Sequence, residues 1–178
     1  MKKILIVVDI QNDFVSGSLG TPQAQMIIPN VIAKINESGK RGDLILFTRD
    51  THQSNYLDTQ EGKNLPVVHC IEGTEGWEIC RDIDMSDIDY LYVDKPSFGW
   101  AKWNETLRGH MDDVKEIELC GLCTDICVIS NALILKAYFP EVKVTVDASC
   151  CAGVTEESHK AALLTMKMCQ VNVINDCC

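Results

Sequence analysis

Ile4-Leu5-Ile6-Val7-Val8-Asp9 is an unbroken apolar run that ends in a carboxylate. Such a run, without alternation between apolar and polar residues, is typical of a strand that is buried on both faces of a parallel sheet. Five more short segments rich in β-branched residues follow at wide spacing; they are Leu44–Thr48, Tyr90–Asp94, Glu116–Cys120, Lys143–Asp147 and Val171–Asn175. The sequence therefore predicts six strands in an open, mostly parallel sheet.

Helical patterns separate the predicted strands. Apolar residues recur at helical spacing in Ile27–Asn36, Asp125–Tyr138 and Glu156–Cys169, and less regularly in Trp100–Met111. The residues expected to face the core are Ile126, Ile129, Leu133 and Ala137 in the second helix, and Ala161, Leu164 and Met168 in the third. Because helices alternate with strands, we expect a Rossmann-like α/β fold of three layers, with helices on both faces of the sheet.

Length and charge narrow the class of protein. The 178 residues predict one domain spanning residues 1–178, since domains cluster near about 100–200 residues. The net charge of −10 argues against binding nucleic-acid phosphates or an anionic membrane surface. No apolar run approaches the roughly 20 residues that cross a bilayer, and the N-terminal run is too short for a signal peptide. We therefore expect a cytoplasmic protein whose ten cysteines are mostly reduced.

Reactive side chains follow the predicted strands. Asp9, Asp50, Lys95 and Asp147 stand at or just beyond strand ends, and Cys127 lies shortly after the fourth strand. Binding sites of open α/β sheets form beyond the carboxyl ends of the strands. We therefore expect carboxylates, an ammonium and a thiol to meet at one edge of the sheet.

Cys127 is the candidate nucleophile. The run from Gly121 to Val128 leads from a strand end through a turn into an apolar helix, which puts Cys127 in the first helical turn. There the exposed N–H groups and the helix dipole lower the pKa of a thiol and can bind an oxyanion. Lys95 would favour the thiolate further, and Asp9 could carry the proton. The alternative is that Cys127 is a buried packing thiol.

Other cysteines and one histidine support weaker interpretations. Cys120 and Cys123 form a C-x-x-C pair, but Cys120 falls within a predicted strand, and no second C-x-x-C completes a zinc site. No function is assigned to the pairs Cys150-Cys151 and Cys177-Cys178. His159 is expected to be a surface residue on its helix.

Potential metal ligands flank the long irregular segment Thr51–Arg81. Asp50 and His52 are alternate residues, so their side chains lie on one side of an extended stretch. His69 lies further along the segment, and Asp58 and Glu61 lie between. A carboxylate and imidazole set suits Zn²⁺, Fe²⁺ or Mn²⁺, whereas solvated acids and a surface histidine are the alternative.

Four short motifs and a single lysine follow one another along the chain. They are Asp9–Phe14 (D-x-Q-x-D-F), Thr48–His52 (T-x-D-x-H), His69–Thr74 (H-C-x-x-G-T), Lys95 and Gly121–Val128 (G-x-x-T-D-x-C-V). Each motif is weak alone, but the set spans nearly the whole chain. It resembles the motifs of the isochorismatase-like cysteine hydrolases, and within them those of the nicotinamidases.

The resemblance implies an isochorismatase-like hydrolase domain with a catalytic triad of Asp9, Lys95 and Cys127. It also implies a cis peptide at Leu122–Cys123 and an oxyanion hole formed by the backbone N–H groups of Cys123 and Cys127. These positions select Cys127 rather than Cys123 as the nucleophile.

The resemblance further implies a metal site beside the triad, with Asp50, His52 and His69 as ligands. Many nicotinamidases have a second histidine shortly after the first, which this chain lacks. A subset uses a glutamate in this loop, so Glu61 is the expected fourth ligand and Asp58 is the fallback. Many relatives also carry an aromatic residue before the His69 position. Here the candidates to contact the substrate are Phe14, Phe98, Trp100 and Trp103.

The resulting hypothesis is a metal-dependent cysteine amidase, with zinc the first choice of metal, that converts nicotinamide to nicotinate and ammonia through a thioester. A second hypothesis keeps the cysteine chemistry but assigns another small amide or carbamoyl substrate. A third is a non-catalytic binding member of the family, against which the retained Asp9, Lys95 and Cys127 argue. The sequence leaves a homo-oligomer open.

Overall fold

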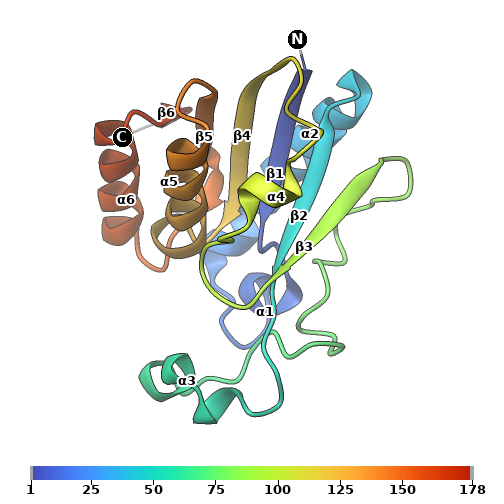
Figure 1. Cartoon of the computed structure of the whole chain (residues 1–178). Coiled ribbons are helices and arrows are strands. Elements are labelled where there is room, and N and C mark those ends of the chain that lie inside the picture. The colour runs from blue at the N-terminus through green and yellow to red at the C-terminus, as the bar shows by residue number, and fades with distance from the viewer. Residues whose placement is uncertain (1, 177–178) are drawn as a thin grey trace.

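The computed structural model describes residues 2–176. Its centre is a six-stranded sheet of order β3-β2-β1-β4-β5-β6 (Figure 1). Every neighbouring pair of strands is parallel, which confirms the predicted sheet. The strands are β1 (Lys2–Val8), β2 (Leu44–Asp50), β3 (Tyr90–Lys95), β4 (Val114–Leu122), β5 (Lys143–Ala152) and β6 (Asn172–Ile174).

Helices cover both faces of the sheet, as expected. In Figure 1, α2 lies behind the sheet, and α5 and α6 lie in front of β5. The helices and helical turns are α1 (Asn12–Val15), α2 (Pro22–Arg41), η1 (Tyr56–Asp58), α3 (Gln60–Asn64), α4 (Trp103–Thr106), η2 (Thr124–Val128), α5 (Ile129–Tyr138) and α6 (Glu156–Met168). Across residues 2–176, none of these helices has both the length and the apolarity needed to span a bilayer.

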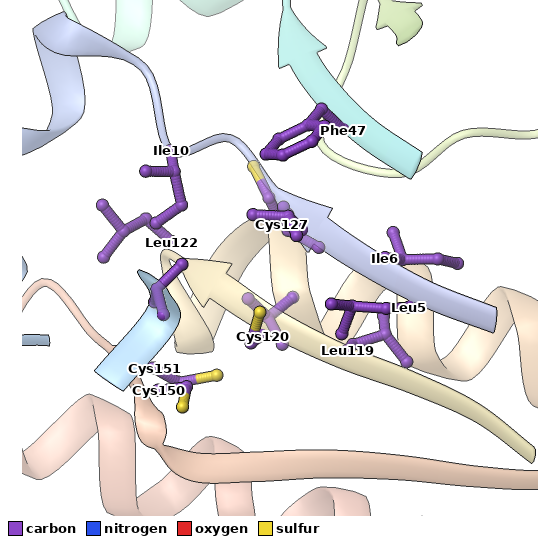
Figure 2. Packing of buried hydrophobic residues seen from close by; sticks show 14 of the residues in the cluster. Leu5, Ile6, Ile10, Phe47, Leu119, Cys120, Leu122, Cys127, Cys150 and Cys151 are labelled. Atoms are coloured by element: carbon purple, nitrogen blue, oxygen red, sulfur yellow. The ribbon is translucent and has the colours of Figure 1, made fainter. Parts of the chain in front are cut away.

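The strand β1 is the centre of the hydrophobic core. Ile4, Leu5, Ile6, Val7 and Val8 are all fully buried, because β2 and β4 flank the strand and layers of helix cover it. Figure 2 shows apolar side chains of β1, β2 and β4 packed together beneath the site. This burial holds the carboxyl end of β1 in a fixed position.

The nucleophile segment begins with an unusually close strand contact. Gly121 in β4 pairs with Val8 in β1 and has a φ of 122°. A Cβ at Gly121 would lie 2.1 Å from the Val8 carbonyl oxygen, so a glycine is required there. The peptide bond between Leu122 and Cys123, just after this close contact, is cis, as the resemblance implied.

The predicted core-facing stripe of α6 is wrong, whereas that of α5 is right in part, since Ile126, Ile129 and Leu133 pack against the core. In α6, Ala162, Leu163 and Met166 are buried, whereas Ala161, Leu164 and Met168 are exposed. Both sets recur at helical spacing, and α6 buries the set that meets α5, β5 and β6.

In α5 the buried apolar residues are Ala132 and Leu135. Of the predicted stripe, Ile126, Ile129 and Leu133 are half-buried and Ala137 is exposed. The helix starts with a π-helical turn, η2, whose wider turn rotates the later residues about the axis.

Two other expectations are corrected. Only Trp103–Thr106 of the predicted helix Trp100–Met111 is helical. Gly109 has a positive φ of 85°, which a right-handed helix does not contain, so the helix does not continue to Met111. Asp147 does not join the site. It forms an ion pair with Lys34 of α2 over 2.7 Å, and β5 continues past it to Ala152.

Candidate active site

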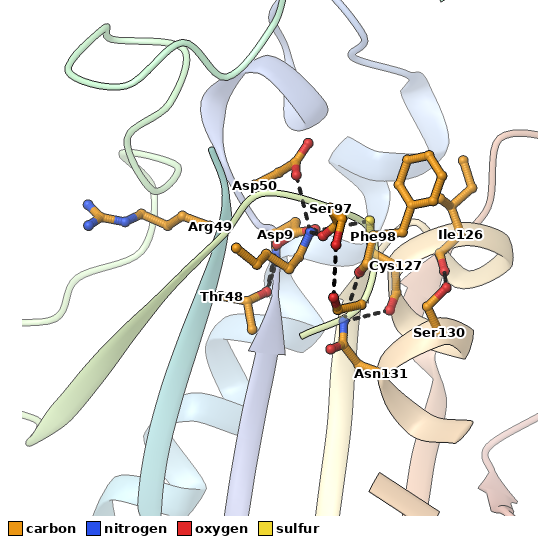
Figure 3. A network of polar contacts seen from close by, with 12 residues as sticks. Asp9, Thr48, Arg49, Asp50, Ser97, Phe98, Ile126, Cys127, Ser130 and Asn131 are labelled. Carbon is orange, nitrogen blue, oxygen red and sulfur yellow. Dashed lines mark hydrogen bonds and ion pairs between the residues drawn. The ribbon is translucent and has the colours of Figure 1, made fainter. Parts of the chain in front are cut away.

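Three side chains meet at the carboxyl ends of the central strands (Figure 3). Asp9 directly follows β1, Lys95 ends β3, and Cys127 lies in η2 after β4. Lys95 Nζ lies 2.7 Å from Asp9 Oδ2 and 3.6 Å from Cys127 Sγ. The Thr48 hydroxyl donates to Asp9 Oδ1 over 2.6 Å and fixes the carboxylate. The arrangement can move a proton between thiol and carboxylate beside a fixed positive charge.

Lys95 carries this positive charge although it is completely buried. Burial alone would lower its pKa, but the negative charges that Asp9, Cys127 and Asp50 can carry outweigh burial and raise it. Lys95 Nζ also donates to the Ser97 carbonyl over 3.1 Å and lies 3.4 Å from Asp50 Oδ1. Lys95 therefore connects the triad with the residues around Asp50.

The Cys127 thiol differs from the expectation of a lowered pKa. Burial raises its pKa well above the ordinary value and outweighs the opposing effect of Lys95. The charge of Asp9, and a hydrogen bond with it, raise the pKa further. Burial also raises the pKa of Asp9, against the lowering effect of Lys95, which makes the carboxylate a better base. A thiol at this position would need a base, such as the neighbouring Asp9, to take its proton before it could act as a nucleophile.

Four metal-ligating side chains converge beside the triad: Asp50, His52, Glu61 and His69. His52 Nε2 lies 3.0 Å from Asp50 Oδ2 and 3.5 Å from Glu61 Oε1. His69 Nε2 lies 3.6 and 3.8 Å from the same two oxygens. Ligands at about 2.0–2.2 Å from a tetrahedral metal ion are roughly 3.3–3.6 Å apart. The donor set therefore fits one divalent transition metal, whereas Asp58 is exposed on η1 and lies outside the cluster.

Neighbouring groups orient the two imidazoles. His69 Nδ1 lies 2.8 Å from the Val67 carbonyl, so Nδ1 carries the proton and Nε2 is left to bind a metal. The Tyr56 ring packs against both histidines, with its centroid 4.6 Å from that of His52 and 4.9 Å from that of His69, and the two imidazoles contact each other at 4.9 Å. The edge of the Phe14 ring packs on His69 at 5.5 Å. These contacts fix the rings without using the donor atoms.

Two residues of the segment after β1 form hydrogen bonds that hold the backbone around Asp50 and beside His69. Gln11 Oε1 accepts the Asp50 N–H over 2.7 Å, and Gln11 Nε2 donates to the Asp50 carbonyl over 2.9 Å. Asp13 Oδ2 accepts the N–H of Cys70, the neighbour of His69, over 2.7 Å. A Cβ at Gly76 would lie 2.2 Å from that same oxygen, so a glycine is required there. Sequence reasoning missed these roles, although Gln11 and Asp13 belong to the first motif.

A cavity of about 320 Å³ opens onto the triad and the metal cluster. Its lining residues are Phe14, Leu19, Thr21, Ala24, Asp50, Glu61, Leu65, His69, Phe98, Leu122, Cys123, Ile126, Cys127, Gly153 and Val154. Among the four aromatic candidates, the structure brings Phe14 and Phe98 to the cavity. Trp103 is instead buried in the core with its indole N–H bound to Asn131, and Trp100 donates its indole N–H to Thr106.

Two residues that the sequence did not single out hold the turn that carries Cys127. Asn131 Nδ2 donates to the Cys127 carbonyl over 2.8 Å and to the Phe98 carbonyl over 3.1 Å (Figure 3). On the other side, His159 Nδ1 lies 2.8 Å from the hydroxyl of the buried Thr124. His159 is thus half-buried against the catalytic turn, which corrects its prediction as a surface residue. A polar side chain four residues after Cys127 in an apolar helix was the available signal for Asn131.

The described cysteines form no disulfide. Cys70, Cys80, Cys120, Cys123, Cys127, Cys150, Cys151 and Cys169 are all free. Cys120 is fully buried in β4, as the sequence predicted, whereas Cys123 reaches the cavity. The pair Cys177-Cys178 lies outside the described residues.

Comparison with known proteins finds a matching family and solved structures of the same fold. A family model described as the isochorismatase domain matches residues 3–176. The solved structure of a pyrazinamidase of Pyrococcus horikoshii in complex with zinc has 30% sequence identity and a TM-score of 0.80, and the match covers 98% of this chain and 99% of the other.

Two further relatives differ in what their names say of activity. A nicotinamidase structure from Bacillus subtilis has 28% identity and a TM-score of 0.81, with 97% of this chain and 99% of the other covered. A protein of Arabidopsis thaliana described as a probable inactive nicotinamidase is 27% identical over 173 residues, with 92% of this chain and 87% of the relative covered.

Proposed function

The chain belongs to the isochorismatase family, and we propose that within it the protein is a metal-dependent cysteine amidase that hydrolyses nicotinamide to nicotinate and ammonia. One observation carries the proposal. Lys95 Nζ lies within 3.6 Å of both Asp9 and Cys127, and the same cavity reaches the four-residue metal cluster. The nucleophile and the metal site thus face one small space, and the base is buried behind them with Lys95.

In the first half of the reaction, Asp9 takes the Cys127 proton as the sulfur attacks the amide carbon. The Lys95 ammonium stabilises the Asp9 carboxylate before this transfer and the developing thiolate during it. The backbone N–H groups of Cys123 and Cys127 bind the oxyanion of the tetrahedral intermediate. Asp9 then gives its proton to the amide nitrogen, the C–N bond breaks, and ammonia leaves a thioester.

In the second half, Asp9 accepts a proton from a water that attacks the thioester carbonyl. The C–S bond breaks, nicotinate is released and the thiol regains the proton. Asp50, His52, Glu61 and His69 would hold the metal. When bound, such an ion supplies a Lewis acid that orients the pyridine ring through its nitrogen. Phe14 and Phe98 would pack against the ring.

One relative is described as a probable inactive nicotinamidase, so family membership alone does not establish turnover. What supports turnover in this chain is that Asp9, Lys95 and Cys127 are all present and mutually in contact.

The test is ammonia release from nicotinamide by zinc-loaded protein, measured beside Cys127→Ala and Glu61→Ala. We expect release by the wild type, none detectable from Cys127→Ala, and a sharp reduction in Glu61→Ala. If the wild type releases no ammonia from nicotinamide but does release it from another primary amide, the cysteine chemistry stands and the substrate is wrong. If Cys127→Ala retains full activity, the mechanism is wrong.

A further inference from the structure

The residues that line the cavity divide into a floor and a rim. Asp50, His69 and Cys127 are almost fully buried and form the floor. Leu65, Phe98 and Val154 line the same cavity but are 39%, 45% and 54% exposed, so they form its rim. These three side chains come from separate parts of the chain, and all are apolar. A ligand that extends from the floor to solvent must therefore pass between apolar side chains.

The charges in the cavity are confined to one side. Among the described residues that line it, the titratable side chains outside the two cysteines are Asp50, Glu61 and His69, and all three belong to the metal cluster. The nearby cation, Lys95, is fully buried and pairs with Asp9. No described lining residue therefore offers a positive side chain outside the metal cluster. An anionic group on the substrate would lose its hydration there without a partner.

The cavity is also larger than the reaction alone requires. Its volume of about 320 Å³ equals roughly ten water volumes. A single-ring carboxamide fills less than half of that space. The cavity therefore has room for a substituent on the ring, and apolar residues such as Leu65, Phe98 and Val154 line it.

We propose that this cavity selects uncharged primary amides whose acyl group carries an apolar extension, with the extension seated between the rim residues Leu65, Phe98 and Val154. The inference rests on the proposed amidase function and names its substrate class more narrowly. Each methylene that leaves water in such a site is worth about a fourfold gain in binding. An anionic substituent of similar size gains nothing from the rim and is disfavoured.

Three pyridine-3-carboxamides test the proposal: the parent compound, its 5-propyl derivative and its 5-carboxylate derivative. With zinc-loaded protein, we expect kcat/KM for the propyl compound to exceed that for the parent by about tenfold, since the rim buries the chain only in part. The carboxylate compound should fall at least about tenfold below the parent. Equal values for all three, or a preference for the carboxylate, would overturn the proposal.

A lysine substitution at the rim should weaken the discrimination against the anionic compound. In Val154→Lys, we expect kcat/KM for the carboxylate compound to rise about tenfold relative to the propyl compound. The matched control is Leu164→Lys, which places the same side chain on an exposed position of α6 outside the cavity. The control should keep the wild-type ratio of kcat/KM for the carboxylate compound to that for the propyl compound. If both lysine variants raise this ratio equally, the effect is one of net charge and the rim has no role.

Binding to zinc-loaded Cys127→Ala separates this inference from the proposed function. Calorimetry should rank the dissociation constants as propyl, then parent, then carboxylate, from tightest to weakest, without any turnover. If no primary amide releases ammonia from the wild type but this ranking holds, the amidase proposal fails and the selectivity of the cavity stands. If ammonia is released but the ranking is flat, only the selectivity fails.

Discussion

The triad and the metal cluster adjoin one another, yet the protein supports them in different ways. Asp9 and Lys95 continue strands of the sheet, and Cys127 follows β4 through a short turn. Glu61 and His69 instead belong to the long segment between β2 and β3. Strands of the sheet place the backbone of Asp9 and Lys95, whereas His69 lies in an irregular segment and depends on side-chain hydrogen bonds such as that of Asp13 with the Cys70 N–H. The triad is therefore expected to be rigid in any state, and the cluster to gain order when a metal neutralises its carboxylates.

The largest expected effect is the loss of the nucleophile. Cys127→Ala should lower kcat by at least about 10⁴-fold, because it removes the thiol that is paired with Lys95 and that forms the thioester in the proposed mechanism. The matched control is Cys123→Ala, whose thiol lines the same cavity but whose backbone N–H is retained. It should stay within tenfold of the wild type in steady-state ammonia release. The opposite result would make Cys123 the nucleophile.

Lys95→Met comes next, and it distinguishes the two regions most directly. Removing one partner of a buried ion pair leaves Asp9 without its counter-charge and should cost about 3–5 kcal/mol of unfolding free energy. Activity should fall by about 10³-fold. Urea unfolding of metal-free protein measures the first effect. If stability were unchanged, the buried pair would not hold the triad together.

Glu61→Gln should give the converse pattern. In metal-free protein the burial of Glu61 raises the pKa of its carboxyl group, and the negative charge of Asp50 raises it further. Glu61→Gln removes this unfavourable negative charge. Unfolding free energy should therefore stay level or rise, while zinc affinity falls by at least about 100-fold. Asp58→Asn, an exposed carboxylate outside the cluster, is the control and should bind zinc as the wild type does. Equal losses in both variants would reject Glu61 as a ligand.

His159 tests whether the turn that carries Cys127 needs support from α6. His159→Ala removes a single hydrogen bond to Thr124, so kcat should fall by about tenfold at most. His159→Asn keeps a polar atom near the Nδ1 position and should recover most of the loss, with KM unchanged in both. Equal defects in both variants would show that ring packing, and not the hydrogen bond, supports the turn.

The smallest effect is expected far from both regions. Ion pairs with Lys3 and Lys143 and a hydrogen bond with Thr145 outweigh burial and lower the pKa of Glu116 to about 2. Its contribution to stability is present above the unfolded pKa of 4.5 and is lost as the pH falls toward 2. Glu116→Gln should therefore cost about 1 kcal/mol at pH 7 and nothing at pH 2, with activity unchanged. A loss of stability that is independent of pH would contradict the ion pairs.

The sequence predicted the strands and their polar ends well, but it predicted the buried helix faces and the supporting side chains poorly. Continuous apolar runs predicted all six strands, and their polar ends located Asp9, Asp50 and Lys95 correctly at one edge. The α6 stripe was wrong because that helix offers two apolar sets at helical spacing, and only packing against α5 and the sheet decides which set is buried. The pKa of Cys127 was misjudged because complete burial is a property of the assembled site. Asn131 and His159 were missed because their partners lie on other elements.

The position of β1 at the middle of the sheet also has a consequence for biosynthesis. β1 can pair with β2 early, but its other edge awaits β4, which lies more than a hundred residues further along the chain. Non-local pairing of this kind slows folding and leaves an apolar strand edge open while the chain grows on the ribosome. We expect a nascent chain that ends before β4 to aggregate or to bind chaperones. The strand that leads to Asp9 is thus also exposed to misassembly until β4 has been made.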